Sequence, residues 1–196
     1  MLNALNTTEN EGQLVEALIE IDYTNDFVAA DGHLTAGKPA QEIEARVVEL
    51  MNEFEQKGDY VVLATDIHYE NDPFHPETNL FPPHNIAGTN GRNFYGELEP
   101  WYQVHKDKSN VYMMDKTRYS AFAGTDLDLR LRARSIDTVH LIGVCTDICV
   151  LHTAVDAYNL GYKIIVYEKA TASFNQVGHE WALTHFKDSM GAEIKE

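Results

Sequence analysis

A cysteine at position 149 is the residue of this sequence best placed to act as a nucleophile. It lies in TVHLIGVCTDICVLHTAV, residues 138–155, where an apolar β-type run ends and a helical pattern begins. Near a helix N-terminus, backbone N–H groups and the helix dipole favour a thiolate, which attacks carbonyl carbons far better than a thiol does. A cysteine in such a segment is more often an apolar filler of the core, so the hypothesis needs partners elsewhere in the chain.

Two charged residues that end predicted strands are candidates for those partners. Asp22 ends ALIEID and can accept the thiol proton, while Lys116 ends VYMMDK and carries a positive charge that lowers a thiol pKa. Each also has an ordinary explanation, because Asp is common in turns and Lys at a strand end usually points into water. Their joint occurrence with Cys149 favours a catalytic group of the three.

The same stretch offers two rival uses of the cysteine. His152 is three residues from Cys149, so the two share a helix face and could form a Cys–His pair. Cys145 and Cys149 could instead be a redox pair, although their spacing is not Cys-x-x-Cys. The turn 144–149 could also supply two backbone N–H groups that stabilise an oxyanion, with Cys145 contributing its N–H rather than its thiol.

A second group of side chains has the character of a metal site. Asp66 and His68 are two positions apart, and in an extended chain such residues point the same way. His84, or His75 in its place, would complete a set of two imidazoles and one carboxylate, and Glu77 could add a further oxygen. Such a set suits zinc, iron or manganese with positions open for water. Ordinary polar loop residues would give the same spacing.

The elements that must position these residues alternate between strand and helix patterns. An alternating order of this kind predicts an α/β fold, a three-layer α/β/α sandwich around a mainly parallel, Rossmann-like sheet of about six strands. Gly58 and Gly161 fit the positions just past helix ends. The strand candidates are residues 14–21, 60–65, 110–114, 138–143 and 162–167, with a weaker one at 192–194, and the helix candidates are 40–57, 125–133, 147–160 and 176–189.

In open parallel sheets, ligands bind beyond the carboxyl ends of the strands. That rule selects Asp22, Asp66, Lys116 and the turn 144–149, which follow four different strand candidates. A proline-rich insertion at about 66–103 adjoins the same edge, and a connection of that length inside a compact domain is more often functional than idle. We therefore expect one crevice to collect both groups.

The length and composition of the chain restrict its domain number, its partners and its compartment. The 196 residues predict one domain, residues 14–196, after a flexible polar tail at 1–13. The net charge of −16 argues against nucleic acid or an anionic membrane as partner, and no apolar run is long enough to span a bilayer. Two cysteines without a disulfide pattern, and no charged-then-apolar leader, favour a reducing cytoplasm.

The sequence resembles the isochorismatase-like superfamily of cysteine hydrolases, most closely its nicotinamidase branch. The resemblance is carried by ALIEIDYTNDF, ATDIHYEN, DKTRYSAF and GVCTDICVLHTAVDAYNLGY, and it covers nearly the whole chain. Cys149 argues against the vinyl-ether-cleaving isochorismatases, which lack the nucleophile.

The resemblance implies a role for each candidate residue. Asp22, Lys116 and Cys149 match the catalytic triad; the 144–145 peptide matches a cis bond that exposes the Cys145 N–H, which with the N–H of Cys149 forms the oxyanion hole. The metal ligands matched are Asp66, His68 and His84, with Glu77 as a possible fourth, direct or through water, and the ring-binding positions are Phe27, Phe81 and Tyr119.

The implied activity is deamidation of nicotinamide to nicotinate and ammonia in NAD salvage, with pyrazinamide as a further substrate. The implied cofactor is one divalent ion, zinc first and iron or manganese next, and the implied assembly is a homodimer or homotetramer. Two other functions stay open: a sister cysteine hydrolase that acts on a carbamoyl or ureido compound, and a non-catalytic metal-binding or redox-sensing protein.

Overall fold

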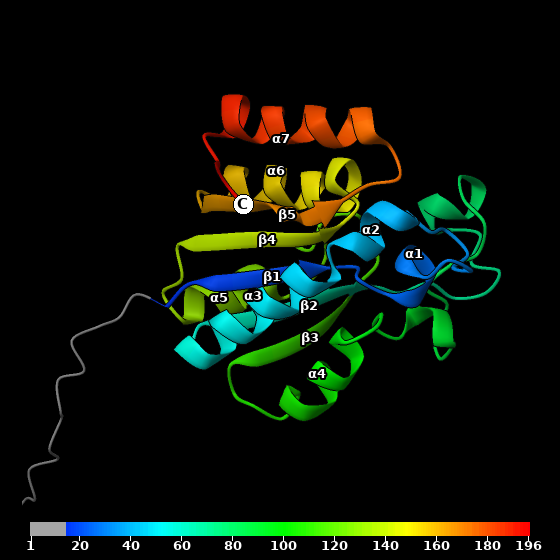
Figure 1. Cartoon of the computed structure of the whole chain (residues 1–196), viewed down its shortest axis with the longest axis horizontal. Coiled ribbons are helices and arrows are strands. Elements are labelled where there is room, and N and C mark those ends of the chain that lie inside the picture. Colours follow the sequence, from blue (N-terminus) through cyan, green and yellow to red (C-terminus); the bar gives the residue numbers. More distant parts are fainter. Residues whose placement is uncertain (1–14) are drawn as a thin grey trace, which may run out of the picture.

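The computed structural model describes residues 15–196 and contains one six-stranded sheet. All strand pairs are parallel, and the spatial order is β3-β2-β1-β4-β5-β6 (Figure 1). This is the order of a Rossmann-type sheet, which confirms the predicted fold class. The strands are β1 Ala17–Ile21, β2 Tyr60–Asp66, β3 Val111–Lys116, β4 Thr138–Val144, β5 Lys163–Ala172 and β6 Glu193–Lys195.

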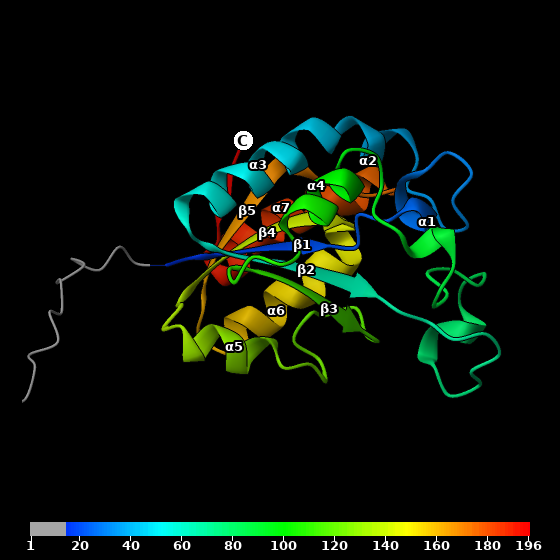
Figure 2. The same cartoon turned by 90° about the horizontal axis from the view of Figure 1, so that it is seen from below.

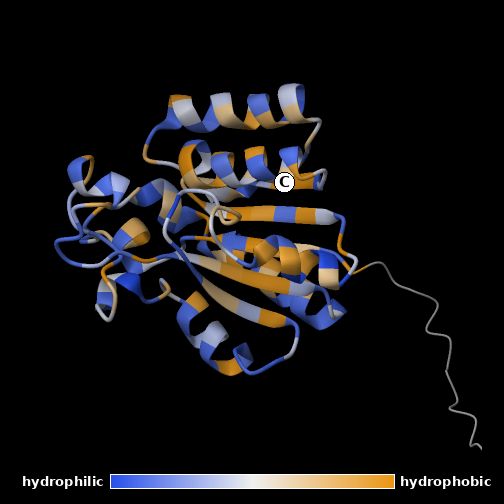
Figure 3. Cartoon of the chain, turned by 180° about the vertical axis from the view of Figure 1, so that it is seen from behind, coloured by the Kyte–Doolittle hydropathy of each residue, from blue (hydrophilic) through white to orange (hydrophobic). Residues whose placement is uncertain are grey.

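Helices cover both faces of the sheet (Figure 2). One face packs against α2 (Lys38–Glu42), α3 (Glu44–Lys57) and α4 (Leu98–His105), and the other against α5 (Leu127–Ala133), α6 (Leu151–Asn159) and α7 (Gln176–Met190). Because the strands are covered on both sides, β1, β2 and β4 are buried along their whole length. Figure 3 shows the hydrophobic residues gathered along these strands.

Helix α3 illustrates how the local sequence produces these layers. Val47, Leu50, Met51 and Phe54 recur at helical spacing and form a buried face against the sheet. The helix ends at Gly58, whose left-handed backbone (φ 81°) is a conformation that glycine adopts without steric cost. The buried face and the C-terminal end of this helix therefore follow from its sequence.

The predicted elements differ from the observed ones mainly at their ends. The helix predicted at 40–57 is two helices, because the chain turns at Ile43 between α2 and α3. The helix predicted at 147–160 begins with a separate π-helical turn, Thr146–Val150, before α6. The insertion at 66–103 holds η1 (Pro76–Asn79), η2 (Asn90–Arg92) and the first turns of α4, and a short α1 (Asn25–Val28) was not predicted.

Two other expectations concern the ends and the surroundings of the domain. The tail predicted at 1–13, and the first residue of the strand predicted at 14–21, lie outside the described residues. Within residues 15–196, no helix is long and apolar enough to cross a membrane. The long connections after β1 and β2 gather at the carboxyl ends of the strands (Figure 1), and that edge carries the candidate site.

Candidate active site and metal centre

Four neighbouring strands deliver the candidate residues to one edge of the sheet. Asp22 follows β1, Asp66 ends β2 and Lys116 ends β3, and the register pairs Asp66 directly with Lys116. On the other side of β1, strand β4 leads into Cys145 and the π-helical turn that contains Cys149. Since β1 and β4 flank the point where the strand order reverses, this is the edge at which such sheets bind ligands.

Close packing of β1 against β4 depends on a glycine. Gly143 lies opposite Ile21 and has a positive φ of 110°, and a Cβ atom at this position would overlap the Ile21 carbonyl oxygen. A side chain would push the two strands apart just before Asp22 and Cys145. Asp22 itself has a left-handed backbone (φ 61°), and its Oδ1 accepts the Asp66 N–H at 2.7 Å.

Lys116 is the centre of the first group. Its Nζ lies 2.7 Å from Asp22 Oδ2, 3.0 Å from Asp66 Oδ1 and 3.8 Å from Cys149 Sγ. All three ionic side chains are 0–1% exposed. The structure therefore brings the predicted triad together, with Lys116 between the acid and the sulfur. The buried charge of Lys116 is paired with two carboxylates, which offsets the cost of burying it.

Burial and charge pairing set the protonation states of these groups. Burial opposes the charge of Lys116, but attraction to Asp22 and Asp66 outweighs it and holds the lysine pKa well above its usual value. Burial likewise opposes the charge of Asp66, yet Lys116 and His68 lower its pKa below the usual range. For Asp22 burial prevails over Lys116 and, with help from the Asp66 charge, raises the pKa to about 6.

The thiol differs from the sequence expectation. Lys116 does lower the pKa of Cys149, as expected, but burial raises it more, and Asp22 and Asp66 add to the rise, so the net pKa lies well above the usual value. The helix N-terminus expected beside the sulfur is instead a π-helical turn. The resting side chain is thus a thiol, and a reaction at sulfur needs a base to take its proton.

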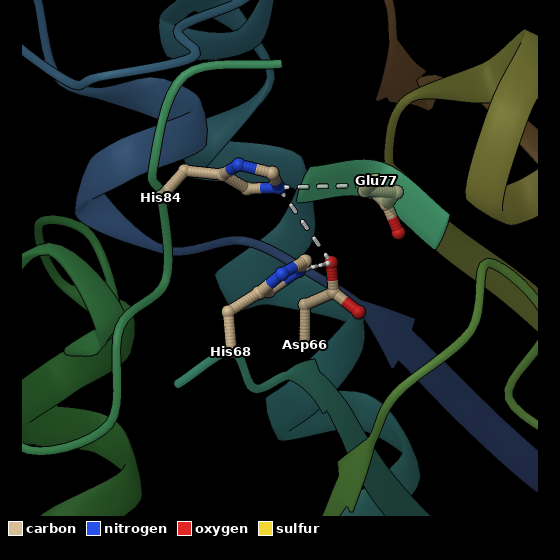
Figure 4. A group of neighbouring side chains, drawn as sticks. All are labelled: Asp66, His68, Glu77 and His84. Carbon is tan, nitrogen blue, oxygen red and sulfur yellow. Dashed lines mark hydrogen bonds and ion pairs between the residues drawn. The ribbon is translucent and has the colours of Figure 1, made fainter. Parts of the chain in front are cut away.

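The predicted metal ligands form the second group (Figure 4). One ligand atom from each of Asp66, His68, Glu77 and His84 lies within 4.8 Å of every other, and all four residues are buried. The His68 Nε2 is 3.1 Å from Asp66 Oδ2, while the His84 Nε2 is 4.0 Å from that oxygen and 3.6 Å from Glu77 Oε2.

The hydrogen bonds of the histidines decide which imidazole completes the set. His84 donates its Nδ1–H to the Pro82 carbonyl at 2.8 Å, so in the neutral imidazole Nε2 carries a lone pair, and this nitrogen is buried without a hydrogen-bond partner. His75 uses both ring nitrogens, since Nε2 donates to the Thr117 carbonyl and Nδ1 accepts the Glu77 N–H. His84 is therefore the available donor, and a buried lone pair among carboxylates fits a divalent cation.

Asp66 belongs to both groups, a feature that was not predicted from the sequence. Its Oδ1 contacts Lys116 and its Oδ2 contacts His68. The metal group and the cysteine group are thus joined by one carboxylate. The paired register of Asp66 and Lys116 produces this link, and it is visible only once the strands are aligned.

A cavity with about 360 Å³ of unfilled space adjoins both groups. The three aromatic residues predicted to hold a flat ring all line it, together with Asp66, Glu77, Cys145 and Cys149. Sequence reasoning missed three further lining residues, Leu34, Ile148 and Phe174. Phe174 follows β5, which runs to Ala172 rather than to the predicted end at 167, so the strand-end rule would have selected it from a correct boundary. The predicted aromatic residues are Phe27, Phe81 and Tyr119.

The remaining sulfur and histidine candidates have other partners. His152 is exposed, donates Nδ1–H to the Ile148 carbonyl at 2.7 Å and lies against the Tyr119 ring. Cys145 is a free, buried thiol whose pKa burial raises to about 12. The His152 and Cys145 side chains therefore do not compete with Asp22 and Lys116 for a role beside Cys149. The peptide bond between Val144 and Cys145 is cis.

The fold and the site define a class: an α/β protein with a buried cysteine, lysine and aspartate beside a group suited to a metal ion. The family model described as the Isochorismatase domain matches residues 16–195. The chain belongs to this family, as the sequence resemblance predicted.

Three solved structures are similar over most of the chain. Nicotinamidase/pyrazinamidase PncA from Bacillus subtilis is 61% identical with a TM-score of 0.92, covering 93% of this chain and 100% of that one. N-carbamoylsarcosine amidase from Thermoplasma acidophilum is 34% identical (TM-score 0.79; 93% and 96% covered). The pyrazinamidase of Pyrococcus horikoshii, solved in complex with zinc, is 30% identical (TM-score 0.80; 92% and 98% covered).

Proposed function

We propose that this protein is a nicotinamidase, a cysteine amidohydrolase that converts nicotinamide to nicotinate and ammonia in NAD salvage and also cleaves pyrazinamide. The observation that carries the proposal is the position of Cys149: its sulfur lies 3.8 Å from the Lys116 ammonium and lines the same cavity as Asp66 and Glu77 of the metal group. An amide whose ring carries a metal-binding nitrogen fits a cavity of this composition. The similarity to the B. subtilis structure, which is named a nicotinamidase/pyrazinamidase, supports the same conclusion.

The catalytic steps follow from the protonation states. Asp22, ionised at neutral pH, takes the Cys149 proton as the sulfur attacks the carboxamide carbon, and Lys116 stabilises the sulfur charge that develops. The N–H groups of Cys145 and Cys149 hold the oxyanion. Asp22 then returns the thiol proton to the nitrogen as the C–N bond breaks, so that ammonia leaves and the acyl group stays on the Cys149 sulfur as a thioester. Water, deprotonated by Asp22, cleaves the thioester to nicotinate and restores the thiol.

Asp66, His68 and His84 would hold one divalent ion, and Glu77 would complete the set directly or through water. Two imidazoles and two carboxylates suit zinc, and also iron or manganese. When bound, the ion supplies a Lewis-acidic position for the pyridine nitrogen, which anchors the ring and leaves the carboxamide beside the thiol. Phe27, Phe81 and Tyr119 then contact the faces and edges of the ring.

Ammonia release from nicotinamide tests the proposal. The Cys149→Ala variant should lose at least about two orders of magnitude in kcat, because the nucleophile is removed, while it still binds the substrate. Cys145→Ala is the matched control, since it removes the other buried thiol and keeps the backbone N–H. Full activity in Cys149→Ala would reject covalent catalysis at this residue.

The second candidate is a sister hydrolase that acts on a carbamoyl or ureido compound, and the 34% identity to an N-carbamoylsarcosine amidase favours it. Such substrates need no anchor for a ring nitrogen. Metal analysis of the purified protein, combined with ammonia release from nicotinamide and from N-carbamoyl compounds, separates the two. A redox sensor would instead form a reversible disulfide or sulfenate and release no ammonia.

We further propose a cytoplasmic homo-oligomer, a dimer or tetramer, that acts on small molecules and binds neither nucleic acid nor membrane. The net charge of −16 supports the exclusion of polyanionic partners, and two free buried thiols suit a reducing compartment. Light scattering of the purified chain measures the assembly.

A further inference from the structure

One buried residue links the two histidines of the metal group. Asn85 directly follows His84, is fully buried and has a left-handed backbone (φ 44°). Its carbonyl oxygen accepts the His68 N–H at 3.1 Å, and the His68 carbonyl in turn accepts the Ala87 N–H at 2.9 Å. The backbone at Asn85 therefore fixes the spacing between the segments that carry His68 and His84.

Asn85 is held by a carboxylate that is not a member of the metal group. Asp26, in α1, accepts the Asn85 N–H on Oδ2 at 2.7 Å. Its other oxygen accepts the His33 N–H at 3.2 Å and lies 3.0 Å from His33 Nδ1. The Asp26 side chain is 5% exposed and that of His33 is 70% exposed, so the carboxylate is buried while the imidazole that contacts it lies at the surface.

The Asp26 carboxylate packs tightly against the backbone at Gly91. A Cβ atom on Gly91 would overlap the carboxylate. The Thr24 hydroxyl, two residues before Asp26, donates to Asn85 Oδ1 at 2.9 Å. The segment after β1 thus holds Asn85 by both its backbone and its side chain.

We propose that Asp26 is a positioning residue that sets the affinity of the protein for its divalent ion, acting through Asn85 on His68 and His84. This inference rests on the metal site of the proposed function. Asn adopts left-handed backbone more readily than any residue except glycine, and the charge-assisted hydrogen bond from its N–H to the Asp26 carboxylate holds Asn85 in this conformation. Without that bond the two imidazoles would have to be ordered when the ion binds, which lowers affinity.

The test compares Asp26→Ala and Asp26→Asn with the wild type. The zinc dissociation constant is measured on metal-free protein, without substrate, by competition with a chromophoric chelator. We expect Asp26→Ala to raise it roughly tenfold to a hundredfold, the range found when a group that supports a metal ligand is removed. Asp26→Asn should raise it as well, because both carboxylate oxygens accept backbone N–H groups and an amide can replace only one of them.

Asp31→Ala is the matched control. Asp31 is exposed and lines the same outer groove as Asp26, so its removal takes away the same charge from the same region. Its zinc affinity should equal that of the wild type. Saturating zinc should restore kcat in the Asp26 variants, which a general loss of structure would not allow.

An unchanged zinc affinity in folded Asp26→Ala or Asp26→Asn would overturn the inference, as would an equal loss in Asp31→Ala. If Asp26→Ala does not fold, the isosteric Asn variant decides. Failure of the wild type to bind zinc would instead refute the metal site of the proposed function. The two failures are therefore distinguishable in one titration series.

Discussion

Replacing Lys116 with methionine is the most informative perturbation of this site. The substitution keeps an unbranched side chain of similar length but removes the ammonium that lies 2.7 Å and 3.0 Å from two buried carboxylates. Both carboxylates then lose the attraction that opposes the effect of burial on their pKa values. Asp22, whose pKa is already about 6 with the lysine present, becomes protonated at neutral pH.

The magnitude follows from the role of Asp22. A protonated Asp22 cannot accept the Cys149 proton, and a positioned general base is worth about 10²–10⁴ in rate. We expect kcat/KM for nicotinamide to fall by at least that range at neutral pH. Removing one partner of a buried ion pair also costs about 3–5 kcal/mol in the free energy of unfolding. Asp22, whose pKa is already raised with the lysine present, then has a folded pKa further above its unfolded value, so the stability deficit shrinks at low pH and grows as pH rises.

The assay is ammonia release as a function of pH, with urea unfolding measured in parallel. In the wild type, kcat/KM should fall tenfold per pH unit below about 6, where Asp22 becomes protonated. Lys163→Met is the matched control, because the Lys163 ion pair with Asp137 is exposed and is worth about 0–1 kcal/mol. Wild-type activity in Lys116→Met, or an acid limb unchanged from the wild type, would refute the assignment of base and cation.

Three further outcomes are expected. His84→Ala should lose the bound divalent ion in metal analysis, because the substitution removes the buried Nε2 that has no hydrogen-bond partner. His105→Ala should keep the ion, since the His105 imidazole bonds the Trp101 carbonyl on α4. Equal metal content in the two variants would contradict the ligand set. Phe174→Ala should raise KM for nicotinamide about fivefold through loss of roughly 1 kcal/mol of apolar contact, and an unchanged KM would exclude its ring from the substrate cavity. In the metal-free protein, folding lowers the pKa of Asp66, so its contribution to stability is present above the unfolded pKa of about 4 and is lost as pH falls through the folded pKa. Asp66→Asn should therefore flatten the acid side of the plot of unfolding free energy against pH. A curve parallel to that of the wild type would contradict the lowered pKa.

Much of the fold could be predicted because it rests on local patterns. The continuous apolar runs of β1, β2 and β4, the helical face of α3 and its glycine end are all short-range features. Boundaries were less accurate where packing overrides propensity. The helix predicted at 147–160 was wrong in its first turn, which is π-helical and lies over the end of β4, and this turn places Cys149.

The candidate residues could be selected because parallel strands deliver their carboxyl-terminal side chains to one edge. This rule predicted the residue types and the edge of the sheet at which they lie, but not which side chains contact one another. The contact of Asp66 with Lys116 and the hydrogen bond from Asn85 to Asp26 depend on pairings across 50 and 59 positions of the chain.

The sequence by itself determined the α/β architecture and selected the candidate nucleophile and the candidate metal ligands, with His75 and His84 as alternatives, because strand and helix periods and residue chemistry are local properties. Only the tertiary structure decided the protonation states. The Cys149 thiol pKa is raised rather than lowered, and that of Asp22 reaches about 6, because both depend on how completely the surrounding layers exclude water from a single lysine and two carboxylates. It also decided between His75 and His84, since the choice rests on which imidazole nitrogen the fold leaves without a hydrogen bond.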